Sequence, residues 1–117
     1  MRLPPPKQYR RAETMLLLTI DQIPGKSFSV LGLVRGSTIQ CKNIGHDFLS
    51  GLQNLVGGEM DSYTQMMNDA RDIATVRMTR EAESLGADAV IGLRYTTSSV
   101  AQGAAEVMVY GTAVRYE

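Results

Sequence analysis

The sequence predicts one α+β domain whose elements follow the order strand, strand, helix, helix, strand, strand. The main evidence is the stretch from Tyr63 to Leu85, where apolar or small residues recur with a 3.6-residue period, as expected for a helix with one face against a core. Apolar runs of strand length lie on both sides of this stretch. A chain of 117 residues, 44% of them hydrophobic, is large enough for a single core.

The long helix has predicted signals at both of its ends. Ser62 and Gln65 have the spacing of a capping box, in which each side chain binds a free backbone N–H of the first turn. Gly86 follows the last apolar position and favours the left-handed conformation that ends many helices. The run from Ala87 to Tyr95 is then predicted to be a buried third strand.

Two extended segments are predicted before the helices. Met15–Ile20 and Ser27–Ile39 are mostly apolar, and the short connection between them contains a Pro-Gly turn signal, so a hairpin is predicted. Gly32 and Gly36 interrupt the second segment, which indicates a bulge or the close approach of another backbone.

A shorter helix and a last strand complete the predicted domain. Asn43–Val56 has a natural N-cap in Asn43 and an apolar face, and it is followed by two glycines. Thr96–Gly103 is polar and small and is predicted to be a loop, and Glu106–Arg115 is predicted to be the fourth strand.

The fourth strand and the long helix predict a homo-oligomer. The apolar residues of the strand alternate over both faces, with Val107, Val109 and Ala113 on one and Met108, Tyr110 and Val114 on the other. The predicted helices cover one face only. The long helix should extend about 36 Å, whereas a compact domain of this size has a radius of gyration of about 13 Å. Apolar surface of both elements is therefore expected to be buried between copies.

Residues 1–14 are predicted to be a tail, so that the domain spans 15–117. Three consecutive prolines in the tail are incompatible with a helix or a central strand. The tail is basic and has no acidic residue before Glu13; its cations are Arg2, Lys7, Arg10 and Arg11. It is interpreted as a solvated terminus, which is the commoner case, or as an arm that contacts an acidic surface or a phosphate.

Charge balance and cysteine content restrict the function. The chain has 12 basic and 12 acidic residues, so no overall field favours nucleic acid or an anionic membrane. Arg77 and Arg80 share a helix face, but acidic neighbours dilute their charge. No apolar run approaches the roughly 20 residues of a membrane span. The single cysteine excludes an internal disulfide and predicts a reducing, cytoplasmic location.

Several motifs together resemble the YbjQ-like family. They are Asn43-Ile44-x-x-Asp47-Phe48, Val56-Gly57-Gly58, Ala70-Arg71-x-Ile73-Ala74, Leu85-Gly86-Ala87-Asp88-Ala89-Val90-Ile91-Gly92 and Met108-Val109-x-Gly111-Thr112-Ala113-Val114. The similarity covers Met15 to Val114. It implies an antiparallel sheet packed on two helices and a ring-like pentamer. The family is described as a heavy-metal-binding domain of unknown function, so the resemblance also implies that this chain could bind a metal ion.

The soft metal ligands in the sequence are Cys41, His46 and the methionines. Cys41 and His46 are five residues apart, at the start of the shorter predicted helix, and would suit a divalent or soft ion such as Zn²⁺ or Cu⁺. Two ligands make an incomplete site, so several copies would have to meet at one ion; the alternative is that both residues are bystanders. Met66 and Met67 are predicted to be core filler rather than a Cu⁺ site.

The sequence argues against an enzyme without excluding one. It has no Gly-rich phosphate loop, CxxC or HExxH motif, and Asp88 is predicted to cap backbone N–H groups in the helix-to-strand turn. We therefore predict a protein of unknown function that acts as a cytoplasmic homopentamer and binds a small ligand or a metal ion. The alternatives are an enzyme of unassigned class with an interfacial active site, and a purely structural or interaction module.

Overall fold

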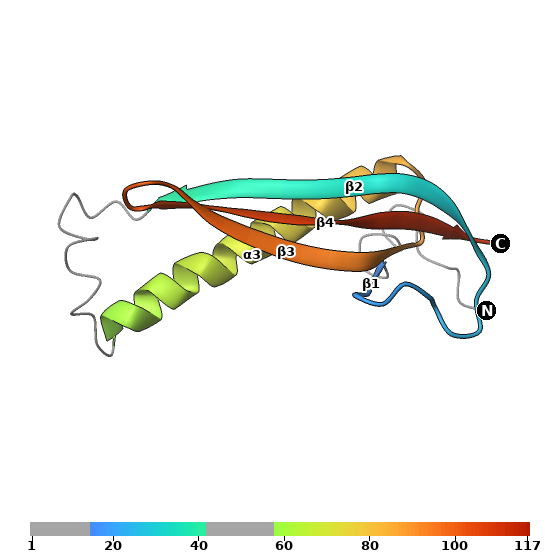
Figure 1. The fold of residues 1–117 in the computed structure, drawn as a ribbon, viewed down its shortest axis with the longest axis horizontal. Helices are drawn as coiled ribbons and strands as arrows, with labels where there is room; N and C mark the ends of the chain where they lie inside the picture. The colour runs from blue at the N-terminus through green and yellow to red at the C-terminus, as the bar shows by residue number, and fades with distance from the viewer. Residues whose placement is uncertain (1–14, 42–57) are drawn as a thin grey trace, which may run out of the picture.

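The computed structural model describes residues 15–41 and 58–117 (Figure 1). Along the chain these residues form strands β1 (Leu16–Leu17) and β2 (Phe28–Cys41), helix α3 (Gly58–Ser84), and strands β3 (Ala89–Ala101) and β4 (Ala104–Tyr116). The strands form one sheet in the order β1-β3-β4-β2. The predicted tail, residues 1–14, and the predicted helix Asn43–Val56 lie outside the described residues.

The class is α+β, as predicted, but the sheet is mixed rather than antiparallel. The predicted hairpin between the first two strands is wrong, because β1 pairs in parallel with Ala89 and Val90 of β3. β2 lies at the opposite edge of the sheet and pairs with β4 over its full length, from Phe28 to Cys41. Since β4 supplies the backbone hydrogen-bond partners of β2, the first strand joins the sheet at its other edge.

The predicted loop Thr96–Gly103 is also wrong, because β3 continues to Ala101. Only Gln102 and Gly103 form the turn into β4, and Gly103 has a φ of 75°, which glycine adopts without strain. The Ser/Thr run joins the sheet because each residue finds a partner in β4; Thr97, for example, lies opposite Val107. Its threonines are β-branched and suit an extended backbone.

Helix α3 begins earlier and ends where the sequence predicts. Because α3 starts at Gly58, Ser62 lies inside the helix and the capping-box prediction is wrong; the amide of Gln65 instead donates to Oδ1 of Asp69 at 2.9 Å. At the other end Gly86 is left-handed, with φ 81°, and its N–H donates to the carbonyl of Glu83. The N–H of Ala87 donates to the carbonyl of Ala82, which completes a Schellman cap. In the described ranges no helix combines the length and the apolarity needed to cross a membrane.

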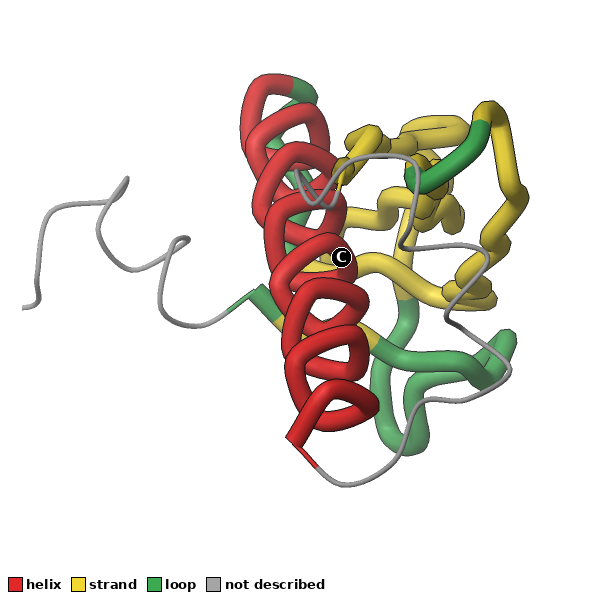
Figure 2. Tube along the Cα trace, turned by 90° about the vertical axis from the view of Figure 1, so that its left-hand side faces the viewer, coloured by secondary structure: helices red, strands yellow, loops and turns green. Residues whose placement is uncertain are grey.

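The core lies between α3 and one face of the sheet (Figure 2). Small residues let the helix approach closely, and the facing side chains are short aliphatic ones: Ala70, Ala74, Met78 and Ala82 pack on Val34, Val90, Val107, Val109 and Ala113. Gly36 of β2 lies directly against the backbone of Ala74 and Met78, so the predicted close approach is confirmed. The predicted bulge is confirmed at Gly32, where the register of β2 shifts.

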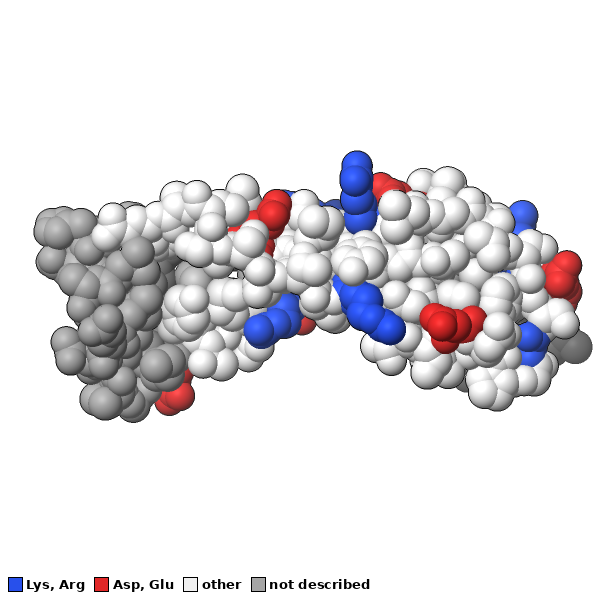
Figure 3. All heavy atoms as spheres, viewed as in Figure 1, with Lys and Arg blue, Asp and Glu red and all other residues white. Residues whose placement is uncertain are grey.

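Within residues 15–41 and 58–117, the other face of the sheet is covered at one end only. There the connection between β1 and β2 packs Ile23 onto Ala89, Ile91 and Val114. Farther along, this open face leaves Leu33 and Ile39 of β2 66% and 56% exposed. Figure 3 looks onto it and shows a largely uncharged surface with scattered charged groups. The described part is elongated, 56 × 32 × 23 Å with a radius of gyration of 17.9 Å, which agrees with the expectation from the long helix.

Candidate functional site

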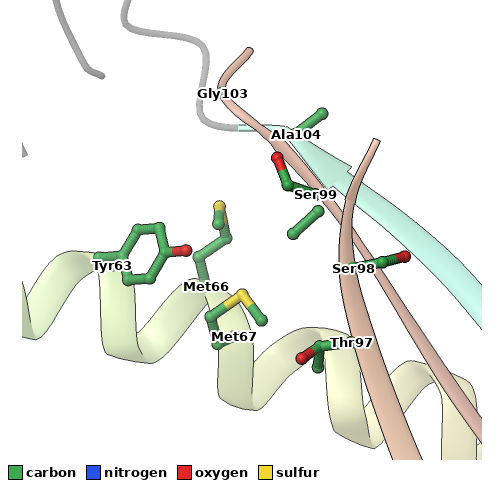
Figure 4. A pocket seen from close by; sticks show the side chains of 9 residues that line it. Tyr63, Met66, Met67, Thr97, Ser98, Ser99, Gly103 and Ala104 are labelled. Atoms are coloured by element: carbon green, nitrogen blue, oxygen red, sulfur yellow. The ribbon is translucent and has the colours of Figure 1, made fainter. Parts of the chain in front are cut away.

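A pocket of about 210 Å³ lies between the first turns of α3 and the tip of the β3–β4 hairpin (Figure 4). Three segments contribute its lining: Tyr63, Met66 and Met67 from α3, Thr97, Ser98 and Ser99 from β3, and Gly103, Ala104 and Ala105 from the turn and the start of β4. The pocket is therefore built by segments that are far apart in the sequence, and it exists because β3 extends far enough to face the helix.

Secondary-structure periodicity places the lining side chains. Tyr63, Met66 and Met67 have i, i+3 and i+4 spacing, so they share one helix face. Thr97 and Ser99 alternate along β3 and lie on the side of the sheet that faces the helix. Met67 also packs against the core cluster, so the core-filler prediction is confirmed for Met67, although both methionines line the pocket.

The chemistry of the pocket suits a small uncharged ligand. Its lining offers two thioethers, a phenol and several hydroxyls, and none of the nine lining residues carries a charged side chain. Thioethers are polarizable and adapt to apolar groups, while hydroxyls both donate and accept hydrogen bonds. A cavity with an apolar body and a few polar groups is typical of small-molecule sites.

The family model that matches this chain is described as "putative heavy-metal-binding" and covers residues 15–117. The chain belongs to the YbjQ-like family. A UPF0145 protein from Clostridium novyi is 63% identical over 101 residues, which are 86% of this chain and 98% of that protein. A UPF0145 protein from Thermus thermophilus is 54% identical over 104 residues, which are 88% of this chain and 91% of that protein. The resemblance seen in the motifs is thereby confirmed.

A solved structure shares the fold of this YbjQ-like chain. It is the crystal structure of a protein of unknown function from Pediococcus pentosaceus, which superposes with a TM-score of 0.61 at 18% identity and covers 88% of this chain and 98% of that one. At this level of identity the likeness concerns the α+β fold alone.

The described part of the YbjQ-like chain does not assemble a heavy-metal site within one copy. Cys41 is the last residue of β2, and its thiol is free and exposed. Residues alternate along β2, and Thr38 and Gln40 face the helix side, so Cys41 lies on the face away from Met66 and Met67. His46 lies outside the described residues. Within residues 15–41 and 58–117 no three His, Cys, Asp or Glu side chains gather in a way that would hold a metal ion.

Asp88 of the YbjQ-like chain has a structural role. Its Oδ2 accepts a hydrogen bond from the backbone N–H of Tyr116 at 2.9 Å, and its own N–H donates to the carbonyl of Val114 at 2.8 Å. The carboxylate therefore binds a backbone N–H at the end of β4, a partner other than the N–H groups of the helix-to-strand turn that the sequence predicts. This bond fastens the end of α3 to the sheet.

The hydroxyl side of the pocket was not predicted from the sequence. In contrast, the spacing of Tyr63, Met66 and Met67 in the sequence predicts that they share one helix face. Thr97 and Ser99 fall in the stretch predicted to be a loop, and no local signal places them opposite the helix. Their position depends on the pairing of β3 with β4.

Proposed function

We propose that this YbjQ-like protein is a non-enzymatic homo-oligomer, a pentamer by its resemblance, that binds a small molecule in the pocket between α3 and the β3–β4 hairpin. The observation that carries the proposal is the uncharged lining of that pocket, which combines two thioethers with a phenol and hydroxyls. Such a lining binds and orients a ligand but supplies no strong acid, base or nucleophile for a reaction.

The oligomeric part of the proposal is supported by exposed apolar surface. Leu33 and Ile39 of β2 lie on the open face of the sheet, and Val76 of α3 is 47% exposed on the outside of the helix. Large apolar side chains on two sides of an elongated protomer favour contacts between copies. A reducing compartment such as the cytoplasm suits the exposed thiol of Cys41, which would otherwise be open to cross-linking.

Native mass spectrometry of the freshly purified protein tests both parts at once. We expect a ring, preferably of five subunits, with additional mass from a retained ligand. Met66→Lys places a charge in the pocket and is expected to remove that mass without changing the subunit count. Thr64→Lys is the matched control, because it adds the same charge at an exposed position of α3 that does not line the pocket. A wild-type ring without bound mass, whose melting temperature no small molecule raises, would favour a purely structural module.

A soft metal ion held between copies is the second candidate ligand. It is supported by the family description and by the exposed thiol of Cys41, with His46 five residues farther along the chain. After loading with Zn²⁺ or Cu⁺ under reducing conditions and desalting, we expect elemental analysis to find retained metal in the wild type. Cys41→Ser and His46→Ala should each lower it about tenfold or more, whereas Ser37→Ala should not. Equal metal content in all four proteins would rule this site out.

A further inference from the structure

In the part of the chain that the structure describes, the outer edge of β3 is open over most of its length. β1 pairs only with Ala89 and Val90, and residues 18–20 extend this cover as far as Leu93, whose N–H donates to the carbonyl of Leu18 at 3.0 Å. From Arg94 to Ala101 no described strand lies on the outer side of β3. Figure 1 shows β1 beside one end of β3 only.

Backbone groups of three residues point outward along this open edge. Leu93 directs its N–H away from β4, and alternate residues of a strand point the same way. Tyr95, Thr97 and Ser99 therefore present three N–H and three C=O groups to the outside. An extended chain laid along β3 would find the partners that it needs for a fifth strand.

The opposite edge of the sheet is partly covered, because side chains of α3 bind two backbone groups in the middle of β2. On β2 the N–H of Arg35 donates to a carboxylate oxygen of Glu81 at 3.1 Å, and the guanidinium of Arg77 donates to the carbonyl of Ser37 at 2.7 Å. These α3 side chains therefore occupy two of the backbone groups to which another chain would bind. The stretch from Tyr95 to Ala101 has no proline, lysine or glycine that would discourage pairing.

The charge beside the open edge favours a basic strand. The first half of α3 lies next to the distal part of β3, where the two elements line the pocket. Over residues 58–72 the sequence of α3 has four acidic residues, Glu59, Asp61, Asp69 and Asp72, against one basic residue, Arg71. The only charged residue of the open edge is Arg94, whose guanidinium donates to the carbonyls of Thr19 and Leu93 at the end next to β1, and the stretch from Tyr95 to Ala101 has no charge.

We propose that the basic N-terminal tail of a neighbouring copy, residues 1–14, adds as a strand to the outer edge of β3. The tail has four cations before its first acid, which matches the acidic half of α3. Extended, its 14 residues span up to about 46 Å, and the edge from Tyr95 to Ala101 is about 23 Å long. Residues 7–14 follow the prolines and supply the strand. The proposal rests on the homo-oligomeric part of the proposed function and not on the pocket's ligand.

The direction of β1 favours a neighbour over the same copy. β1 runs parallel to β3 beside Ala89 and Val90, so the chain direction at Met15 points back toward the start of β3 and away from the open edge. To reach that edge in its own copy, the tail would have to reverse and pass residues 18–20, which already lie along β3. The tail of another copy would not have to reverse its direction or pass residues 18–20.

Disulfide scanning in the full-length protein tests the proposal. In a Cys41→Ser background, Thr97→Cys is combined in turn with Tyr9→Cys, Arg10→Cys, Arg11→Cys and Ala12→Cys, and each protein is oxidised and run on a non-reducing gel. Because successive side chains of a strand point to opposite faces, we expect cross-links between chains at alternate tail positions only. Thr112→Cys, on another part of the sheet, replaces Thr97→Cys as the control and should give none.

The outcomes separate the proposal from its alternatives. A covalent multimer at alternate positions supports it, while cross-links within one chain, at all four positions equally, or at none overturn it. As a second readout, amide exchange over residues 94–101 should become at least tenfold faster in Arg10→Glu with Arg11→Glu than in the wild type; equal exchange also contradicts the proposal. An intact ring without cross-links would reject the arm and leave the oligomer standing, whereas a monomeric wild type would reject both.

Discussion

Replacing Gly36 with valine should strongly destabilise the domain. A Cβ atom at this position would collide with the backbone carbonyl of Ala74 and the backbone N–H of Met78, and it would lie 3.0 Å from the carbonyl carbon of Arg77. These are backbone atoms of a regular helix, so no side chain can rotate away. Overpacking of a core typically costs 1–3 kcal/mol, and because α3 as a whole must move, we expect about 3 kcal/mol or more.

Urea unfolding followed by circular dichroism measures this loss. Gly36→Ala should lose less than Gly36→Val, since the added group is smaller. Ser37→Ala is the matched control, because Ser37 is exposed and its backbone contact with Arg77 is unaffected; its free energy of unfolding should change by no more than about 0.5 kcal/mol. A loss below about 1 kcal/mol for Gly36→Val would mean that α3 does not approach β2 so closely.

Introducing Leu33→Lys together with Ile39→Lys should convert the oligomer into folded monomers. Both side chains are more than half exposed in the protomer, so the change costs the fold little. In an oligomer that buries the open face, two lysines would lose their hydration without gaining partners, which costs several kcal/mol at each subunit contact. Size-exclusion chromatography with light scattering at micromolar concentration should therefore report the mass of one chain, with unchanged helix content.

The control for this change is Gln102→Lys, in the exposed turn between β3 and β4, which should assemble as the wild type does. If the Leu33→Lys, Ile39→Lys protein keeps its assembly, the contacts between copies lie elsewhere than on the open face. If the wild type is itself monomeric, the homo-oligomer is wrong.

Local features of the fold could be predicted from residues close in the sequence. Gly86 ends α3 because the left-handed cap involves only the residues from Ala82 to Ala87. The bulge at Gly32 and the close approach at Gly36 follow from the absence of a side chain at those positions. The family could also be recognised, since its motifs are continuous stretches of sequence. For the candidate site, the shared helix face of Tyr63, Met66 and Met67 could be predicted in the same way, because it depends only on their spacing in the sequence.

By itself, then, the sequence determined the α+β class, the end of α3, the irregularities of β2 and the helix side of the pocket. Only the tertiary structure decided that β1 pairs with β3, that the Ser/Thr run from Thr96 to Ser99 is a strand, and that Cys41 lies on the face away from the methionines. The physical reason is that a helix cap is satisfied within a few residues, whereas strand pairing depends on which distant edge remains free. A run of polar side chains is compatible with either a loop or a strand. Residues 96–99 form a strand because β4 lies beside them and provides backbone partners.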